Sequence, residues 1–146
     1  MAGLVEAYVA FWQGLSPQRL DQLEAYYTPD VRFVDPFNDV RGLAGLRSVL
    51  AHMYQQCDHV AVSVDEINGR PPVVYLRWRF SFRLRGDRRE RPPIDGVSRV
   101  VFAPDGRVRE HIDYWDAASQ LYGQLPIIGT LMRWLRRRMA APPPKQ

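Results

Sequence analysis

The run at residues 73–85, VVYLRWRFSFRLR, limits the possible folds more than any other part of the chain. From residue 76 onward apolar and polar side chains alternate, and successive side chains of a β-strand point to opposite faces. The apolar side chains of one face are Leu76, Trp78, Phe80, Phe82 and Leu84. The other face carries arginines and a serine. Such a strand is typical of an antiparallel sheet that is covered on a single side.

Three neighbouring segments have the same alternation and extend the pattern into a meander of four long strands. These segments are residues 59–67, 94–103 and 107–115. Turn signals separate them, because Asn68-Gly69 predicts a hairpin turn and Pro104-Asp105-Gly106 predicts a second turn. A shorter strand is expected at residues 31–36, where Pro36 ends it.

Apolar residues at helical spacing dominate the beginning and the end of the chain. The expected helices are residues 4–13, 17–27, 43–56 and about 117–139. Gly14 ends the first helix, and Ser16-Pro17 begins the second as its N-cap and first helical position. The last helix is interrupted near Gly123 and Pro126, and residues 140–146 form a frayed tail. Helices that precede a meander predict an α+β fold with one sheet face covered, in a single domain over residues 1–139.

The length of 146 residues suits one domain with its own core. A single cysteine, Cys57, excludes an intrachain disulfide and a cysteine-based metal site, and it fits a cytoplasmic location. The N-terminus lacks a basic leader region, and no apolar run approaches the roughly 20 residues that a membrane span requires. No metal site is predicted from the histidines either, because their spacing with the acids does not converge.

The net charge of +4 belongs to the C-terminal segment and not to the chain as a whole. From residue 117 onward there are five basic residues and no acid, which leaves 15 of the 20 basic residues against all 16 acidic ones. A nucleic-acid-binding surface requires a basic stripe on the folded body. We therefore expect no nucleic-acid partner.

The last strand, at EHIDYWD, places three chemically different side chains on one face: His111, Asp113 and Trp115. One interpretation is the wall of a ligand cavity, in which polar groups and a flat indole face a small molecule. The other is a satisfied core pair of imidazole and carboxylate that supports the sheet. Asp116, just before two alanines, is expected to be the N-cap of the terminal helix.

The order of elements, with YVAFWQGLSPQRLDQLEAYYTPDVRFVDP near the start and GVSRVVFAPDGRVREHIDYWD near the end, resembles the nuclear transport factor 2-like superfamily. More narrowly it resembles the branch with ketosteroid isomerases and SnoaL-like polyketide cyclases, over about residues 4–120. The resemblance implies a cone, in which a curved antiparallel sheet wraps around the N-terminal helices and leaves an internal apolar pocket. It also implies a homodimer that forms through the outer sheet face.

The resemblance further implies roles for individual residues. The acid before a proline at the end of the first strand, here Asp35, corresponds to the general base of the isomerases, and Tyr8 corresponds to their hydrogen-bond donor. Their third catalytic position, a protonated aspartate, falls on Ser98; Asp95 takes that place only if a β-bulge shifts the strand. His111 and Asp113 lie at pocket positions, and His111 shares a proton with one of the two aspartates.

Two functions remain open at this point. One is cofactor-independent acid–base catalysis on a small lipophilic molecule, as an isomerase, cyclase, dehydratase or hydrolase, with Asp35, Tyr8, His111 and Asp113 as catalytic candidates. The other is a non-catalytic module that binds a lipophilic ligand or a protein. The predicted ligand-contacting residues are Trp115, Trp78, Phe80, Ser98, Val100 and Phe33. The aromatic members of this set have an alternative interpretation as ordinary core residues. Asp35, before a proline, has one as an ordinary turn residue that caps the following segment.

The terminal helix has an apolar stripe and a cluster of arginines at its C-terminal end. Docking on the protein body or on a partner subunit explains the stripe, and the helix dipole favours arginines at that end. The helix is then also a candidate lid over the cone. Binding to a membrane surface is the second interpretation, because basic amphipathic helices bind anionic lipid. The sequence alone favours docking.

Overall fold

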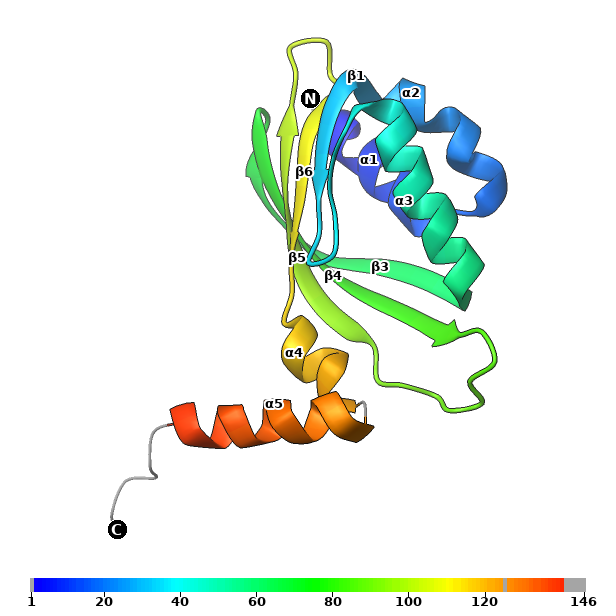
Figure 1. Cartoon of the computed structure of the whole chain (residues 1–146). Coiled ribbons are helices and arrows are strands. Elements are labelled where there is room, and N and C mark those ends of the chain that lie inside the picture. Colours follow the sequence, from blue (N-terminus) through cyan, green and yellow to red (C-terminus); the bar gives the residue numbers. More distant parts are fainter. Residues whose placement is uncertain (1, 125, 141–146) are drawn as a thin grey trace. The chain divides into compact units, whose positions relative to one another are not determined.

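The computed structural model of the protein describes residues 2–124 and 126–140. The chain divides into two compact units, Met1–Trp115 and Asp116–Gln146. In the first unit a curved, unclosed sheet of six strands is covered on one face by the N-terminal helices (Figure 1). The α+β class expected from the strand and helix patterns is therefore confirmed.

The elements of the first unit follow the expected order. The helical elements are α1 (Ala2–Gln13), the 3-10 helix η1 (Pro17–Gln22), α2 (Leu23–Tyr26) and α3 (Gly42–Gln56). The strands are β1 (Tyr27–Val34), β2 (Asp39–Arg41), β3 (Cys57–Arg70), β4 (Val73–Leu84), β5 (Ile94–Phe102) and β6 (Val108–Tyr114). They lie in the order β2-β1-β6-β5-β4-β3, and only the contact between β1 and β6 is parallel. The β3–β6 meander is as predicted, whereas β2 was not predicted.

Two boundaries differ from the sequence-based expectation. The turn between β3 and β4 is at Pro71-Pro72 and not at Asn68-Gly69, which pair with β4 as part of the ladder. Prolines cannot donate ladder hydrogen bonds, so they stay outside the paired region. The second expected helix also ends earlier. Tyr27 is the first residue of β1, and its side chain is completely buried beneath α1 and not on a helix face.

The core lies between the covered sheet face and the helices. Its fully buried members come from both layers: Tyr8, Phe11, Leu23, Tyr27, Leu46, Val31, Val74, Val100 and Val108. Strand alternation places the even-numbered residues of β5 on this covered face, with Ile94, Ser98, Val100 and Phe102 all buried. Any polar side chain that points the same way, such as Ser98, must therefore find its hydrogen-bond partners inside the protein.

The outer sheet face is charged. Glu110 accepts a hydrogen bond from Arg99 at 2.5 Å and lies 3.8 Å from Arg32, which is itself paired with Asp39. Around these groups is a shallow depression of about 250 Å³, lined by Asp30, Arg32, Arg41, Arg99, Val101, Arg109 and Glu110. A second ionic group on the same face joins Arg77 and Arg79 to Asp65 and Asp95.

The second unit contains α4 (Ala117–Gln120), the 3-10 helix η2 (Tyr122–Gln124) and α5 (Pro126–Met139). The predicted cap is confirmed, because the Asp116 carboxylate accepts a hydrogen bond from the backbone N–H of Ser119 at 3.0 Å. None of the helices in the described ranges is long and apolar enough to cross a membrane. The tail predicted at residues 140–146 lies, except for Ala140, outside the described residues.

Candidate functional site

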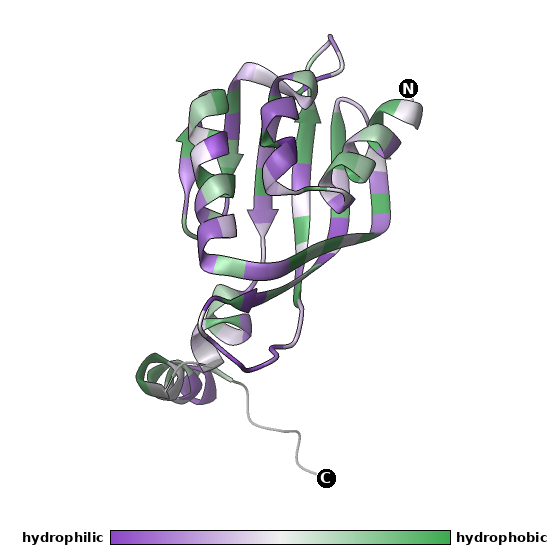
Figure 2. Cartoon of the chain, turned by 90° about the vertical axis from the view of Figure 1, so that its right-hand side faces the viewer, coloured by the Kyte–Doolittle hydropathy of each residue, from purple (hydrophilic) through white to green (hydrophobic). Residues whose placement is uncertain are grey.

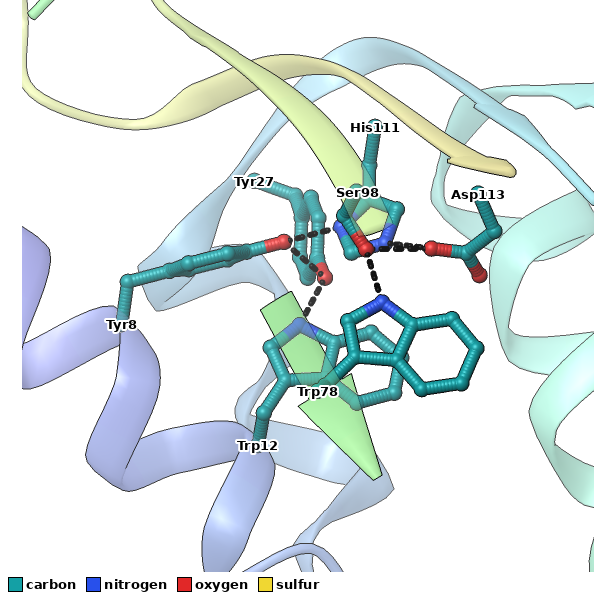
Figure 3. Close-up of polar contacts among 7 residues, drawn as sticks. All are labelled: Tyr8, Trp12, Tyr27, Trp78, Ser98, His111 and Asp113. Carbon is teal, nitrogen blue, oxygen red and sulfur yellow. Dashed lines mark hydrogen bonds and ion pairs between the residues drawn. The ribbon is translucent and has the colours of Figure 1, made fainter. Parts of the chain in front are cut away.

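Seven side chains form one continuous chain of hydrogen bonds on the covered face of the sheet (Figure 3). In order they are Trp12, Tyr27, Tyr8, His111, Asp113, Ser98 and Trp78. The successive heavy-atom distances are 3.0, 2.7, 2.6, 2.7, 2.5 and 2.7 Å. Each distance is within the normal range of a protein hydrogen bond or at its short end. The chain joins α1 to four of the six strands.

Local structure brings each pair of neighbours together. Tyr8 and Trp12 are one helical turn apart, so they occupy the same face of α1. His111 and Asp113 are two residues apart on β6 and therefore share the covered face. Ser98 is directly opposite Asp113 in the β5–β6 pairing. The hydrogen bond between Tyr8 and His111 joins the helical layer to β6.

Among the ionisable side chains of this network, exposure to solvent increases from Tyr27 to the carboxylate of Asp113. Tyr27, Tyr8 and the His111 side chain are 0%, 2% and 4% exposed, whereas the side chain of Asp113 is 15% exposed. Asp113 is thus the most exposed ionisable side chain of the network.

The bonding pattern assigns the position of every hydrogen. An indole N–H only donates and a carboxylate only accepts. Ser98 accepts from Trp78 and donates to Asp113 Oδ1, so His111 must donate to Oδ1 through Nε2. A neutral imidazole then accepts from Tyr8 at Nδ1, while Tyr8 accepts from Tyr27 and Tyr27 accepts from Trp12. A proton on Nδ1 would reverse the direction of the hydrogen bonds that Tyr8 makes with His111 and Tyr27. The hydroxyl hydrogen of Tyr27 would then have no acceptor. We therefore assign a neutral His111 with its hydrogen on Nε2.

The two phenols resist ionisation. Burial raises the pKa of Tyr8 well above its ordinary value, and the neighbouring Tyr27 adds to the rise. Burial also raises the pKa of Tyr27, although its hydrogen bonds with Tyr8 and Trp12 work in the opposite direction. Both residues therefore stay neutral donors near neutral pH. Neither phenol has the character of an activated nucleophile.

The carboxylate of Asp113 has one occupied and one available oxygen. Both of its hydrogen bonds, from His111 and Ser98, converge on Oδ1. Oδ2 accepts no hydrogen bond from any residue in the described part of the chain. A carboxylate that is held firmly through one oxygen and presents the other is suited to accept a proton from a bound molecule.

Aromatic side chains surround this acid–base group. The rings of Phe33 and Trp12 lie 5.0 and 5.2 Å from the imidazole of His111, and Val100 is opposite His111 in the sheet. Trp78 and Phe80 are partly exposed on the same sheet face, and Trp115, which follows β6, is also partly exposed. Phe80 packs on Phe82, and Trp115 packs edge-on against Phe37. These partly exposed rings are the described surface best suited to a flat apolar ligand.

The carboxylate of Asp35 is hydrogen-bonded within a turn, which is not the apolar environment expected of a catalytic base. Its Oδ1 accepts hydrogen bonds from the backbone N–H groups of Phe37 and Asn38, at 2.8 and 2.7 Å. The Asn38 side-chain amide bonds to both carboxylate oxygens, at 3.0 and 3.1 Å. All of these partners belong to the tight turn between β1 and β2. The structure therefore joins Tyr8, His111 and Asp113 in one network, and it does not link Asp35 to them.

The register of β5 resolves the choice between Ser98 and Asp95. The β4–β5 pairing runs without a shift from Val73↔Val101 to Phe80↔Ile94. Ser98 consequently faces His111 and Asp113, whereas Asp95 points to the outer face and lies near Arg77 and Arg79. No bulge moves Asp95 inward.

Sequence reasoning missed two members of the network, Trp12 and Tyr27. The spacing of four residues between Tyr8 and Trp12 was a usable signal, because both polar-tipped aromatics fall on one face of α1. Tyr27 offered no such signal while it was expected to belong to a helix.

A Gly96→Val substitution tests how Trp78 is held. A Cβ built at Gly96 would lie 2.3 Å from two carbons of the Trp78 indole, which covers this glycine across the strand pair. We expect the variant to displace the indole, break its hydrogen bond to Ser98, and lower the free energy of unfolding by about 2 to 4 kcal/mol. Urea titration measures the loss. Gly3→Val is the control, because nothing lies within 4 Å of a Cβ there; equal losses would contradict the packing argument.

Within the described residues there is no group of three or more His, Cys, Asp or Glu side chains that could hold a metal ion. The ionisable side chains of the network are those of Tyr8, Tyr27, His111 and Asp113.

Comparison with protein families places residues 5–111 on the model of the SnoaL-like domain. A comparison with curated proteins found no match. Among solved structures, an NTF2-like protein of unknown function from Burkholderia pseudomallei has a TM-score of 0.70 at 16% identity, covering 82% of this chain and 95% of that one.

Two further structures have similar scores. A Catenulispora acidiphila protein of ketosteroid isomerase-like fold, crystallised in complex with trimethylamine, has a TM-score of 0.67 at 18% identity and covers 81% of this chain and 88% of its own. A putative SnoaL-like polyketide cyclase from Shewanella denitrificans has a TM-score of 0.66 at 19% identity, with coverage of 84% and 97%. At these identities the structural matches show the fold alone.

Proposed function

Because the chain belongs to the SnoaL-like domain family, we propose that it binds a small lipophilic molecule beside Asp113 and transfers a proton on it without a cofactor. The observation that carries the proposal is the available Oδ2 of Asp113, the most exposed ionisable side chain of a hydrogen-bond network whose other ionisable members are almost completely buried. Structures described as putative SnoaL-like polyketide cyclases and as a putative isomerase share the fold.

The proposed step is proton abstraction from carbon. Oδ2 of Asp113 removes a proton from the carbon next to a carbonyl group, and the electron pair of that C–H bond moves into an enolate. The hydrogen bonds from His111 and Ser98 keep the carboxylate in place before and after the transfer. The protonated Asp113 returns the proton at the same or another carbon, so the site is restored without any other reactant. Trp78, Phe80 and Trp115 hold the apolar part of the molecule.

The test compares two aspartates. Asp113→Asn keeps an amide oxygen that accepts from His111 and Ser98 but removes the base, so we expect proton exchange to fall roughly a hundredfold or more. Asp35→Asn is the matched control, because an asparagine oxygen still accepts the turn N–H groups. The measurement is deuterium uptake from D₂O at the α-carbons of aromatic ketones and 1,3-diketones, followed by NMR.

The result decides which of the two aspartates, Asp113 or Asp35, acts as the base. Exchange that survives in Asp113→Asn but is lost in Asp35→Asn would return the role of base to the turn residue. Failure of the parent protein to accelerate exchange in any of these ketones would contradict proton abstraction beside a carbonyl.

The alternative is a non-catalytic binding module, and one observation favours it. Every hydroxyl and N–H hydrogen of the seven-residue chain already has an acceptor within the chain, which is also what a purely structural network requires. Native mass spectrometry of the freshly purified protein distinguishes binding from catalysis when it detects a retained molecule in the absence of exchange. Dimerisation through the outer sheet face, where Tyr75 and Tyr114 are exposed, stays a prediction.

A further inference from the structure

Helix α5 separates its side chains into two faces. At 100° per residue, the apolar residues of this 14-residue helix fall within one half of its circumference. The large apolar side chains are strongly exposed: Ile127 85%, Ile128 47%, Leu131 57%, Trp134 52%, Leu135 44% and Met139 78%. Figure 2 views the helix nearly along its axis and shows hydrophobic residues on one side and hydrophilic residues on the other.

The charge of α5 has one sign. The helix contains four arginines and no acidic residue. Arg133, Arg136 and Arg137 fall on the polar side, whereas Arg138 falls within the apolar half. Arg133 donates to the carbonyl of Gly123 at 2.9 Å. The guanidinium of Arg138 lies 5.7 Å from the centre of the Trp134 ring. The end of the helix thus combines an indole with a cation, a pair suited to the boundary between water and lipid.

We propose that α5 binds the surface of an anionic lipid bilayer, with its axis in the plane of the interface. Its apolar half enters the boundary of the acyl chains, and its arginines contact the lipid phosphates. An apolar protein groove would account for the exposed stripe but not for a polar face of arginines without a single acid. The helix is about 21 Å long, which is too short for a hydrocarbon layer of about 30 Å, so it lies on the membrane and does not cross it. This inference is independent of the proposed enzymatic function.

The first arm of the test removes charge. The full-length protein is co-sedimented with vesicles of phosphatidylcholine alone and of phosphatidylcholine with an equal part of phosphatidylglycerol. We expect binding only to the anionic vesicles, weakened by salt. The double variant Arg136→Glu, Arg137→Glu should bind on the order of a hundredfold more weakly. The control, Arg88→Glu with Arg89→Glu, makes the same charge change in an exposed loop of the first unit and should bind as the parent does.

The second arm removes apolar contact. Leu131→Ser should reduce binding to anionic vesicles roughly tenfold, whereas Ile67→Ser, at an exposed residue of β3, should not. Added anionic vesicles should shift the tryptophan fluorescence of the parent to the blue, and Trp134→Phe should abolish that shift while Trp12, Trp78 and Trp115 remain.

Several results would overturn the proposal. One is that the parent protein stays in the supernatant with anionic vesicles. A second is that the two double variants lose binding equally, because net charge alone would then explain the attraction. A third is that Leu131→Ser changes a dimer into a monomer while vesicle binding is absent, which would assign the apolar face to a second copy of this chain.

Discussion

A His111→Ala variant is expected to lose about 3 to 5 kcal/mol of unfolding free energy. His111 is 3% exposed. Within the seven-residue network, its imidazole alone joins the tyrosines to the carboxylate of Asp113. Its removal leaves the Tyr8 hydroxyl hydrogen without an acceptor, takes one donor from Asp113 and opens a cavity beside Phe33 and Trp12. Urea unfolding followed by circular dichroism measures the loss.

The control for this variant is His52→Ala, at an exposed position of α3, which should change stability by no more than about 0.5 kcal/mol. A second control examines the energetic coupling between Tyr8 and His111. Tyr8→Phe should cost less in the His111→Ala background than in the parent chain, because the hydrogen bond between them is already absent. Additive losses would contradict the assigned bond between Tyr8 and Nδ1.

The second large effect is a loss of stability in alkaline solution. Tyr8 and Tyr27 have pKa values raised by burial, so the folded protein keeps two protons that the unfolded chain loses above about pH 10. The free energy of unfolding is therefore insensitive to these groups below that pH. Above it, the free energy falls by about 1.4 kcal/mol per pH unit for each tyrosine, or about 2.7 for both, until the folded protein itself ionises. Urea titrations from about pH 8 to about pH 11 measure the slope.

Tyr8→Phe removes one of the two groups and should reduce this slope by about half, whatever its effect on stability at neutral pH. Tyr75→Phe removes a phenol that is 45% exposed and should leave the slope unchanged. The assignment of the alkaline transition to the buried tyrosines would be wrong if both variants kept the slope of the parent protein. Phenolate absorbance provides an independent readout, because the part that comes from the two buried phenols should appear only as the protein unfolds.

The two effects also bear on the role of the network. A largely buried network of donors and acceptors that holds one partly exposed carboxylate contributes to stability whether or not the protein is an enzyme. Stability measurements therefore test the geometry, and deuterium exchange with Asp113→Asn tests the chemistry. The two kinds of measurement are independent because the asparagine variant keeps the acceptors of the chain.

Alternation and turn chemistry determined much of the fold, because they are local properties of the chain. The period-two runs predicted the β3–β6 meander and put His111 and Asp113 on one face. Ser98 came from the family resemblance, and the structure decided its register. The family followed from the order of elements. Where a local signal was ambiguous, prediction was wrong by a few residues: Asn68-Gly69 is part of a ladder, and Tyr27 begins a strand.

Only the tertiary structure decided which polar groups meet. Tyr8 and His111 are far apart in the sequence, and their contact depends on how α1 packs across the sheet. The sequence named Asp35 as the base and Asp113 as a partner of His111, but the structure shows Asp35 bonded within its own turn and Asp113 bonded to His111 and Ser98. Side-chain periodicity depends on the backbone of one element, whereas a hydrogen bond between elements depends on register and packing that no single segment contains. For this reason the sequence determined the faces and the structure determined the site.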